Sequence, residues 1–433
     1  MKALILNGSS ALQDMATAVE AALVSQLSAR GYAVACHDLT SLTIPDCKGD
    51  FGCWTATPGI CVQPGPHCDV ARDLIRSDLV VWLTPVTFGG YSSALKRLLD
   101  HCVPLITPWF TTVQSETHHE PRYERFPDVL AIGLAEQKEP ESIRVFERLV
   151  RRNALNMHTR HFLSPVIGRD ELPDVEARAA SWLDSLAASF APQVGGEPLD
   201  LSPRMDLPAE KPKSALLLVG SPRGSASVSA SLAEHLGLLL AERGIAVTTE
   251  HIDSRSTRTD LGIHDPGGLR QADLLVLTTP LYVDSLPAPV TAFLETLAQQ
   301  RALATPSRAR FLAIVNCGFP EAVHNDTALA ICRQFASDAG LAWVGGLGLG
   351  AGGMFAGKPL AQLGGRARAL TQALSLTADA VADGRVVPEE ARRLIAKLPI
   401  PRWLYRFFGD WGFRQEAKKH GVRSRIGARP YAA

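Results

Sequence analysis

Short apolar runs alternate with amphipathic segments along most of the chain. The apolar runs predict strands at residues 2–7, 32–36, 79–84, 129–134 and 160–167, and again at 215–219, 246–250, 273–279, 311–316 and 343–347. Strands that alternate with helical patterns are typical of βαβ units, which build a parallel sheet covered by helices on both faces. The pattern therefore predicts an α/β protein in which two parallel sheets of five strands follow each other along the chain.

The same arrangement of motifs occurs twice. A Gly-Ser turn follows the first strand of each half, at Gly8 and at Gly220, and a Thr-Pro loop ends a later strand, at Pro85 and at Pro280. The two motifs are 77 residues apart in the first half and 60 in the second. We interpret this repeat as an internal duplication into two domains, with a cysteine-containing loop as the extra length of the first. Five strands with a turn after strand one predict the flavodoxin-like doubly wound order.

Composition places the domain boundaries. Residues 1–192 and 214–384 hold the two predicted domains, and the proline-containing segment 193–213 reads as an extended linker. The extension 385–433 carries 12 Lys and Arg against 4 Asp and Glu, with a cluster of aromatic residues. Two interpretations of it stay open. It lies on a membrane surface or contacts a lipophilic substrate, or it is an arm that packs its aromatics on a domain or a partner subunit.

Charge and hydropathy exclude several classes of protein. With 44 basic and 44 acidic residues the net charge is zero, so the basic surface of a nucleic-acid-binding protein is not expected. No apolar run approaches the roughly 20 residues that span a bilayer, and the N-terminus enters a strand directly, so we expect a cytoplasmic protein without a membrane span. Eight cysteines are too few for a disulfide scaffold in 433 residues.

The turn after Gly220 has the chemistry of a phosphate site. Hydroxyls of Ser221, Ser227 and Ser229, the Arg223 guanidinium and free backbone N–H groups stand before a predicted helix, whose N-terminus favours an anion. This turn lacks the glycine motifs of dinucleotide folds and of nucleotide triphosphatases, which leaves a small monophosphate such as that of FMN. The alternative is a serine N-cap with nothing bound.

Other loops are expected to lie beside this turn. The carboxyl ends of parallel strands meet at one edge of a sheet, so the loop Pro280, Leu281, Tyr282, Val283, Asp284 and Ser285 converges on the same place.

Both halves resemble the flavodoxin-like NAD(P)H-dependent FMN reductase family, over roughly residues 1–170 and 214–355. In the second half the resemblance rests on the Gly-Ser-Pro-Arg turn, the 280–285 loop and a third loop. This third loop directly follows a predicted strand and contains Gly318, Phe319 and Pro320. In the first half it rests mainly on the loop Pro85, Val86, Thr87, Phe88 and Gly89. The resemblance implies that these residues contact FMN, with Tyr282 or Phe88 stacking on the ring.

The phosphate turn of the first half departs from the family pattern. Ser9 and Ser10 are present, but no arginine follows, and Asp14 would repel a phosphate dianion. The second half is therefore the better flavin site, and whether the first half binds its own FMN stays open.

Four cysteines lie in one loop of the first half, at Cys47, Cys53, Cys61 and Cys68. In iron–sulfur members of the resembled family such a loop binds a cluster, and four thiolates suffice for a cluster or for zinc. Tight Cys-x-x-Cys pairs are absent, so we expect neither an iron–sulfur cluster nor another metal. The loop is interpreted as a wall of the flavin site, with Trp54 against the ring.

The histidines show no metal spacing, and His118 and His119 stand in a polar loop expected to be solvated.

The resemblance implies an FMN-dependent NAD(P)H oxidoreductase that passes hydride from a nicotinamide through FMN to a quinone, a nitro or azo compound or another small acceptor. The flavin carries the chemistry, so no protein group is expected to be catalytic. Two alternatives stay open: a flavin electron carrier or redox sensor without NAD(P)H activity, and an interaction protein without a cofactor. A homodimer is one assembly that the resemblance allows.

Overall fold

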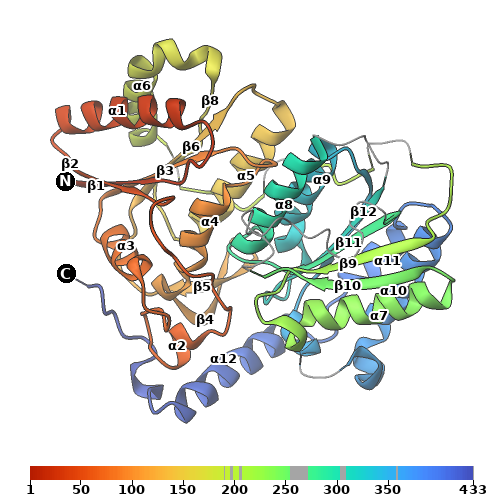
Figure 1. Ribbon diagram of the computed structural model, residues 1–433. Helices are drawn as coiled ribbons and strands as arrows, with labels where there is room; N and C mark the ends of the chain where they lie inside the picture. The colour runs from red at the N-terminus through yellow and green to blue at the C-terminus, as the bar shows by residue number, and fades with distance from the viewer. Residues whose placement is uncertain are drawn as a thin grey trace. The chain divides into compact units, whose positions relative to one another are not determined.

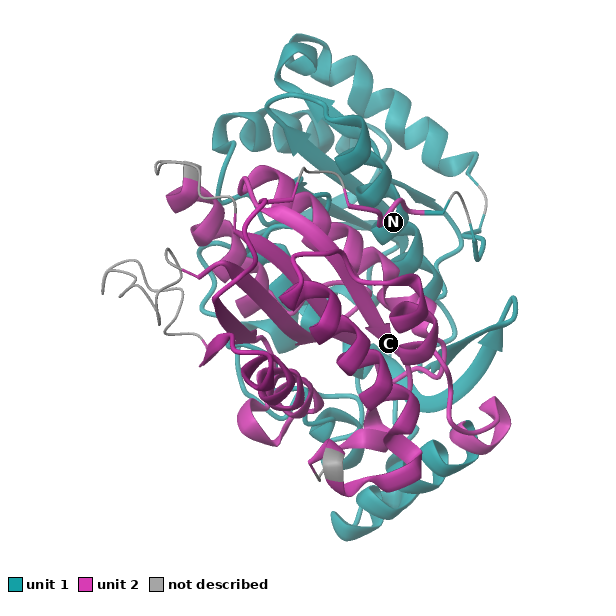
Figure 2. Ribbon diagram, turned by 90° about the vertical axis from the view of Figure 1, so that its right-hand side faces the viewer, with its two compact units in different colours: residues 1–198, 406–433 teal, residues 199–405 magenta. Residues whose placement is uncertain are grey.

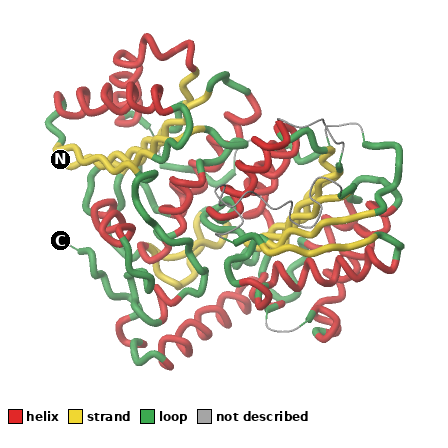
Figure 3. The backbone as a smooth tube through the Cα atoms, in the orientation of Figure 1, coloured by secondary structure: helices red, strands yellow, loops and turns green. Residues whose placement is uncertain are grey.

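The computed structural model describes residues 1–189, 191–195, 198–203, 207–253, 272–302, 309–356 and 359–432. It divides into two compact units (Figure 2). Unit 1 contains residues 1–198 and 406–433, and unit 2 contains residues 199–405. In both units strands alternate with helices along the chain (Figure 3).

The main sheet of unit 1 is parallel and has the strand order β2-β1-β3-β6-β7, with β8 also paired to β6. Its strands are β1 (Lys2–Asn7), β2 (Ala33–Asp38), β3 (Leu79–Pro85), β6 (Asp128–Ala135), β7 (Phe162–Leu163) and β8 (Val166–Gly168). The predicted fifth strand is thus two short strands. Pro165 lies between them, and because proline has no N–H group it cannot continue the ladder.

Helices cover both faces of this sheet (Figure 1). One face carries α1 (Gln13–Ala29) and α6 (Val175–Ala187), and the other carries α3 (Pro66–Ile75), α4 (Ser93–Asp100) and α5 (Pro140–Asn156). The remaining short helices of unit 1 are α2 (Gly52–Thr55), η1 (Val103–Leu105), η2 (Arg169–Asp174) and η10 (Arg423–Arg425). Because both faces are covered, every residue of β3 is buried.

An antiparallel hairpin of β4 (Ile106–Val113) and β5 (Glu116–Pro121) was not predicted. It contains the segment that the sequence assigned to a solvated loop. That expectation is wrong, because His118 is fully buried and its Nδ1 lies 2.7 Å from Asn156 Oδ1. The polar composition of this segment therefore did not predict strands. Polar side chains such as His118 are paired within unit 1 rather than exposed to water.

Unit 2 has one parallel sheet of five strands in the order β10-β9-β11-β12-β13. These are β9 (Ser214–Val219), β10 (Ala246–His251), β11 (Leu274–Pro280), β12 (Arg310–Asn316) and β13 (Ala342–Leu349). When only the strands of each parallel sheet are counted, both sheets follow the order 2-1-3-4-5, which is the flavodoxin-like order. The chain is therefore an α/β protein with two doubly wound flavodoxin-like units, as predicted.

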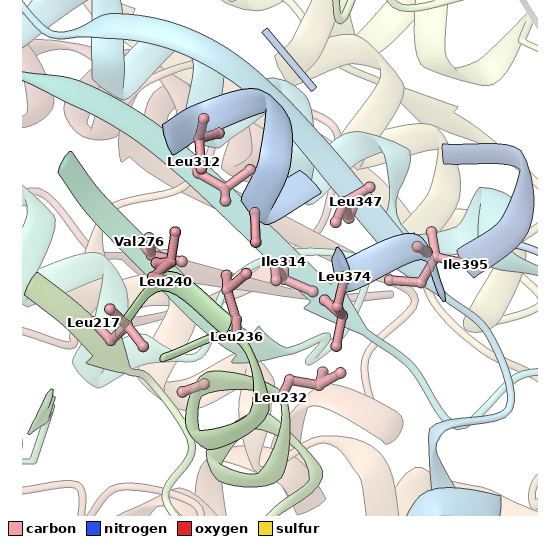
Figure 4. Packing of buried hydrophobic residues seen from close by; sticks show 14 of the residues in the cluster. Leu217, Leu232, Leu236, Leu240, Val276, Leu312, Ile314, Leu347, Leu374 and Ile395 are labelled. Carbon is pink, nitrogen blue, oxygen red and sulfur yellow. The ribbon is translucent and has the colours of Figure 1, made fainter. Parts of the chain in front are cut away.

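One face of the unit 2 sheet packs on α7 (Val228–Glu242), α10 (Arg368–Ala382) and α11 (Glu389–Ile395), and the other on α8 (Ala288–Ala302) and α9 (Asp326–Asp338) (Figure 1). Short helices complete it: η3 (Gly224–Ala226), η6 (Ala322–Asn325), η7 (Gly352–Phe355), η8 (Leu360–Gln362) and η9 (Gly364–Ala367). Leucines of α7 interlock with Val276 and Ile314 of the central strands (Figure 4). This packing holds the amino end of α7 against the carboxyl ends of the strands.

The segment before β9 is held on unit 2 by buried side chains. Arg333 Nε donates to Ser202 O at 2.9 Å, and Arg310 Nη2 donates to Pro208 O at 2.7 Å. Both arginines are 2% exposed. The described residues of this segment therefore lie against the unit without forming a helix or a strand.

The C-terminal extension is shared between the units. Helix α11 contributes Ile395 to the core of unit 2, whereas the residues after Tyr405 belong to unit 1. There Arg122 Nη1 donates to Ile426 O at 2.9 Å and to Ala428 O at 2.7 Å. Phe413 packs edge-on against Trp54. The packed-arm interpretation therefore describes this part of the extension.

Four aromatic side chains of α12 (Arg402–Lys419) do not pack in this way. They are Trp403, Phe407, Phe408 and Trp411, which are 69%, 60%, 53% and 54% exposed. Among the described helices, none combines the length and the apolar character that crossing a membrane requires.

Candidate functional site

The first loop of unit 2 leads from β9 into α7. Ser227 caps the helix, since its Oγ accepts a hydrogen bond from Ala230 N at 3.0 Å. The cap uses only an acceptor site of this hydroxyl, so its hydrogen is still a donor. Ser221 is buried as well, whereas Arg223 is exposed and none of the described residues bonds to its guanidinium. The loop thus presents donors at a positive helix end.

Asn316 ties this loop to the other two. Its Nδ2 donates to Ser229 Oγ at 2.8 Å and to Thr279 O at 3.0 Å. Leu281 N donates to Asn316 O at 2.8 Å. All three loops therefore meet at the carboxyl end of the unit 2 sheet.

The second loop is a two-residue hairpin. Tyr282 and Ser285 exchange both backbone hydrogen bonds, at 2.9 and 3.0 Å. The central residues Val283 and Asp284 have φ of 48° and 55°, which is type I′ turn geometry. A β-branched residue at positive φ is strained. Strain of this kind persists where the surroundings impose it, and it is concentrated at ligand sites.

The third loop begins at Cys317. Gly318 is exposed, and a Cβ built there would meet no atom within 4 Å. Its carbonyl accepts a hydrogen bond from Tyr405 Oη at 2.6 Å, so the first turn of α12 lies on this loop. Phe319 stacks on the ring of His324 at 4.4 Å, and Pro320 is buried. The loop leaves open space beside Gly318.

Neither the thiol nor the phenol at this loop is poised to ionise. Burial raises the pKa of Cys317 to about 12. Burial also raises the pKa of Tyr405. Both groups are protonated near neutral pH, so neither supplies a nucleophile or a base there.

The corresponding turn of unit 1 is shorter. Seven residue positions separate Gly8 from the buried Met15 of α1, against twelve between Gly220 and Leu232 of α7. Ser9 is fully buried and Ser10 is exposed. Only Ser10 of this pair is therefore reachable by a ligand.

Carboxylates surround the turn of unit 1. Arg169 bridges Asp14, in the first turn of α1, and Glu136, just after β6, with N–O distances of 2.5 Å to each. The hydrogen bonds from Arg169 lower the pKa of both carboxyl groups, so both are charged at neutral pH. Leu134 stands in the register position that Asn316 has in unit 2. An anionic phosphate is therefore disfavoured here.

The second loop of unit 1 has the same hairpin as unit 2. Thr87 and Gly90 exchange backbone hydrogen bonds at 3.0 and 2.7 Å, with φ of 52° at Phe88 and 77° at Gly89. Pro85 is buried, Val86 and Thr87 are partly buried, and Phe88 is 9% exposed. Most of the Phe88 ring is therefore covered by protein.

Trp54 does not face a flavin, and that expectation is wrong. The indole is 2% exposed, and its Nε1 donates to Val103 O at 3.1 Å and to Ile106 O at 3.0 Å. Its ring packs between Phe51 and His119. The residue belongs to the core of unit 1 because the unpredicted hairpin covers it.

The eight cysteines are free thiols in the structure. In the cysteine loop, desolvation by burial raises the pKa of Cys47 to about 12 and raises those of Cys53, Cys61 and Cys68 as well.

Sequence reasoning missed three residues of the unit 2 site. Asn316 and Thr279 are the last residues of the predicted strands 311–316 and 273–279, but nothing in the sequence shows that Asn316 joins two loops. Tyr405 lies about 87 residues from Gly318 along the chain, and no local pattern connects the two.

Comparisons with known proteins concern unit 1 first. The model of the family described as NADPH-dependent FMN reductase matches residues 1–116. This match supports a flavin-dependent oxidoreductase in general terms. No second match to the family covers unit 2. No curated protein matches the chain.

Solved structures with a similar fold include three flavodoxin-like oxidoreductases. A putative quinone reductase from Klebsiella pneumoniae is 13% identical, with a TM-score of 0.34, and the match covers 46% of this chain and 91% of that chain. An NAD(P)H:quinone oxidoreductase from Methanothermobacter marburgensis is 15% identical, with a TM-score of 0.32 and coverage of 42% and 96%. An FMN-dependent NADH-azoreductase from Bacillus anthracis in complex with FMN is 10% identical, with a TM-score of 0.32 and coverage of 43% and 99%. Since each TM-score is below 0.5, the strand order of the two sheets carries the fold assignment.

Proposed function

We propose that this protein is an FMN-dependent oxidoreductase that takes electrons from NAD(P)H and passes them to a small-molecule acceptor, and that unit 2 holds the flavin. The observation that carries the proposal is the serine and arginine loop of unit 2. It opens at the amino end of α7, contains no carboxylate between Gly220 and Ala233, and is fastened to the neighbouring loops by Asn316.

The residues of unit 2 fit a flavin monophosphate. Arg223 and the hydroxyls of Ser221 and Ser227 would hold the phosphate, together with the backbone N–H groups at the start of α7. Backbone groups of the 281–285 hairpin would flank the ring, and the open space at Gly318 leaves room for it. Bound FMN would supply the two-electron redox chemistry, for which no protein nucleophile is required.

Unit 1 fits the phosphate less well, because Asp14 and Glu136 place two carboxylates around one arginine. In this proposal residues 214–384 form the flavin-binding domain, and residues 1–192 keep the fold without holding FMN. Quinones and nitro or azo compounds are the acceptors that we propose to assay first, with NADPH and NADH compared as electron donors.

The test starts from the absorbance spectrum of the purified full chain and a titration with FMN. We expect one flavin per chain, and we expect Arg223→Ala to weaken FMN binding by about ten- to a hundredfold, because a hydrogen bond to a charged group contributes about 1.5–3 kcal/mol. Arg385→Ala is the matched control. Arg385 lies two residues before Val387, whose N–H donates to Val344 O near the amino end of β13, so it is far from the carboxyl edge of the sheet where the phosphate is proposed to bind. Ser10→Ala tests unit 1.

Two results would contradict the proposal. A chain that takes up no FMN leaves only the fold, and FMN binding that Ser10→Ala abolishes but Arg223→Ala leaves unchanged moves the site to unit 1. Anaerobic addition of NADPH or NADH then decides the activity. Bleaching of the bound flavin supports an oxidoreductase, whereas flavin that neither nucleotide reduces indicates an electron carrier.

A further inference from the structure

Three side chains with metal-binding atoms meet inside unit 1. Cys61 follows α2, His67 is in the first turn of α3, and His101 directly follows α4. One ligand atom from each lies within 4.8 Å of the other two. Cys61 is partly buried and both histidines are buried. The fold therefore gathers a thiol and two imidazoles from three elements that are separate in sequence.

The orientation of His101 is set by a backbone carbonyl. Its Nε2 lies 2.7 Å from Pro45 O, and a carbonyl only accepts hydrogen bonds, so Nε2 carries the proton. Nδ1 then presents its lone pair, and this atom is 3.3 Å from Cys61 Sγ. Histidines that bind metals characteristically donate their other ring nitrogen to a carbonyl or carboxylate, which fixes tautomer and orientation. His101 has this arrangement.

His67 supplies the second, independent observation. Its side chain is 1% exposed, and neither ring nitrogen has a hydrogen-bond partner among the described residues. Its ring centroid is 4.0 Å from that of His101. A buried polar atom without a partner destabilises the folded state. This destabilisation is removed if a nitrogen of His67 binds a ligand that the protein alone does not provide.

We propose that Cys61, His67 and His101 bind one Zn²⁺ ion. One thiolate and two neutral imidazoles form a donor set typical of zinc, with a fourth position for water or another ligand. Zinc bonds of about 2.3 Å to sulfur and 2.0–2.1 Å to nitrogen, at tetrahedral angles, put those atoms about 3.5 Å apart. The 3.3 Å between Cys61 Sγ and His101 Nδ1 is close to this value, and since the three ligand atoms lie within 4.8 Å of one another, His67 needs a shift of about 1.5 Å at most.

This site differs from the iron–sulfur cluster of the resembled family, which the cysteine spacing does not favour, and it departs from the expectation that no metal binds here. It uses one of the four loop cysteines and two histidines, and it holds a single ion rather than an iron–sulfur cluster. Its place at the start of α3 and the end of α4 gives the ion a structural effect, because it would cross-link the cysteine loop to both helices. The site lies in unit 1 and does not depend on the flavin proposed for unit 2.

The test measures metal on the full-length protein. After loading with Zn²⁺ and dialysis, elemental analysis is expected to find about one zinc per chain, and Cys61→Ser, His67→Ala and His101→Ala are each expected to lose it. Cys36→Ser is the matched control, since Cys36 is an exposed thiol on β2. Loading with Co²⁺ is expected to give intense visible bands of a tetrahedral site and a thiolate-to-cobalt charge-transfer band.

Several results would overturn the zinc site. They are a folded native chain that retains no zinc, zinc that all three variants retain, or Co²⁺ spectra without the thiolate band. Brown protein that contains iron and acid-labile sulfide would replace the site by a cluster. The cobalt spectrum needs no variant, so the test remains decisive even if a substitution prevents folding, and FMN content has no bearing on it.

Discussion

The amide Nδ2 of Asn316 donates a hydrogen bond to Ser229 Oγ at 2.8 Å. This bond joins the end of β12 to the first turn of α7, and both side chains are buried. It fixes the amino end of the helix, where the proposed phosphate would bind, against the carboxyl edge of the sheet. Unit 1 has Leu134 at the register position of Asn316 and no such bond.

Replacing Asn316 tests the role of this bond. We expect Asn316→Leu to weaken FMN binding by about tenfold, because a phosphate-binding helix end that is free to shift loses part of its hydrogen bonds to a charged group. The change also leaves buried polar atoms without a donor and lowers the free energy of unfolding by about 1–3 kcal/mol. FMN titration and urea unfolding measure the two effects. Leu134→Asn, at the same register position in unit 1, is the control. An Asn316→Leu protein that binds FMN as tightly as the native chain would contradict the role of the Asn316–Ser229 bond in FMN binding.

Val283 is held at φ 48° in the hairpin of unit 2. Asn tolerates positive φ and is favoured at the first central position of a type I′ turn. We therefore expect Val283→Asn to raise the free energy of unfolding of unit 2 by about 1 kcal/mol. If the Val283 side chain also contacts the flavin, the same variant binds FMN more weakly.

Thermal unfolding and FMN titration check this prediction. Val323→Asn, at an exposed valine of the same unit whose φ is not positive, is the control and is expected to gain no stability. A Val283→Asn protein no more stable than the native chain would mean that the turn is not strained.

Lys96 and Asp100 form an ion pair within α4, and both side chains are 1% exposed. Removing one partner leaves a buried charge, so we expect Lys96→Met to lower the free energy of unfolding by about 3–5 kcal/mol. Replacing both, as Lys96→Met with Asp100→Leu, is expected to recover most of this loss because neither charge then remains in the interior. Urea unfolding of the three proteins provides the measurement. A double variant as unstable as the single one would refute the explanation.

The lowered pKa of Glu171 predicts that the free energy of unfolding of unit 1 depends on pH. The Gly168 N–H, 2.9 Å from the carboxylate, holds the pKa of Glu171 below its usual value, and Lys138 adds to this effect. A carboxyl with a lowered pKa stabilises the fold above its unfolded pKa of about 4.3, and this stabilisation is lost as the pH falls through the folded pKa. We expect Glu171→Gln to cost about 0.5–1 kcal/mol at neutral pH and progressively less in acid.

Unfolding free energies measured from neutral to acidic pH check this difference. Glu176→Gln, at the start of α6, is the control, because Glu176 forms no ion pair with the described residues. A cost of Glu171→Gln that stays constant as the pH falls would show that the charge of the carboxylate is not what stabilises the fold.

Parts of the site were predictable because they follow from local chemistry and topology. The serines and arginine after Gly220 mark an anion-binding turn, and parallel strands bring the 280–285 loop and the loop at Gly318 to the same edge. The conformation of Val283 was not predictable, since Val-Asp is not a sequence that favours positive φ. The same holds for Trp54, whose burial depends on a hairpin that the polar sequence did not reveal.

By itself the sequence determined the strands of the two parallel sheets, the two flavodoxin-like units and the places of the loops that follow those strands, because apolar periodicity and turn chemistry are local properties of the chain. Only the tertiary structure decided that Asn316 meets Ser229, that the last residues of the chain pack on unit 1, and that Cys61 and His67 meet His101. These contacts join residues tens to hundreds of positions apart, and their energy comes from burial and from hydrogen bonds that exist only after the chain has folded.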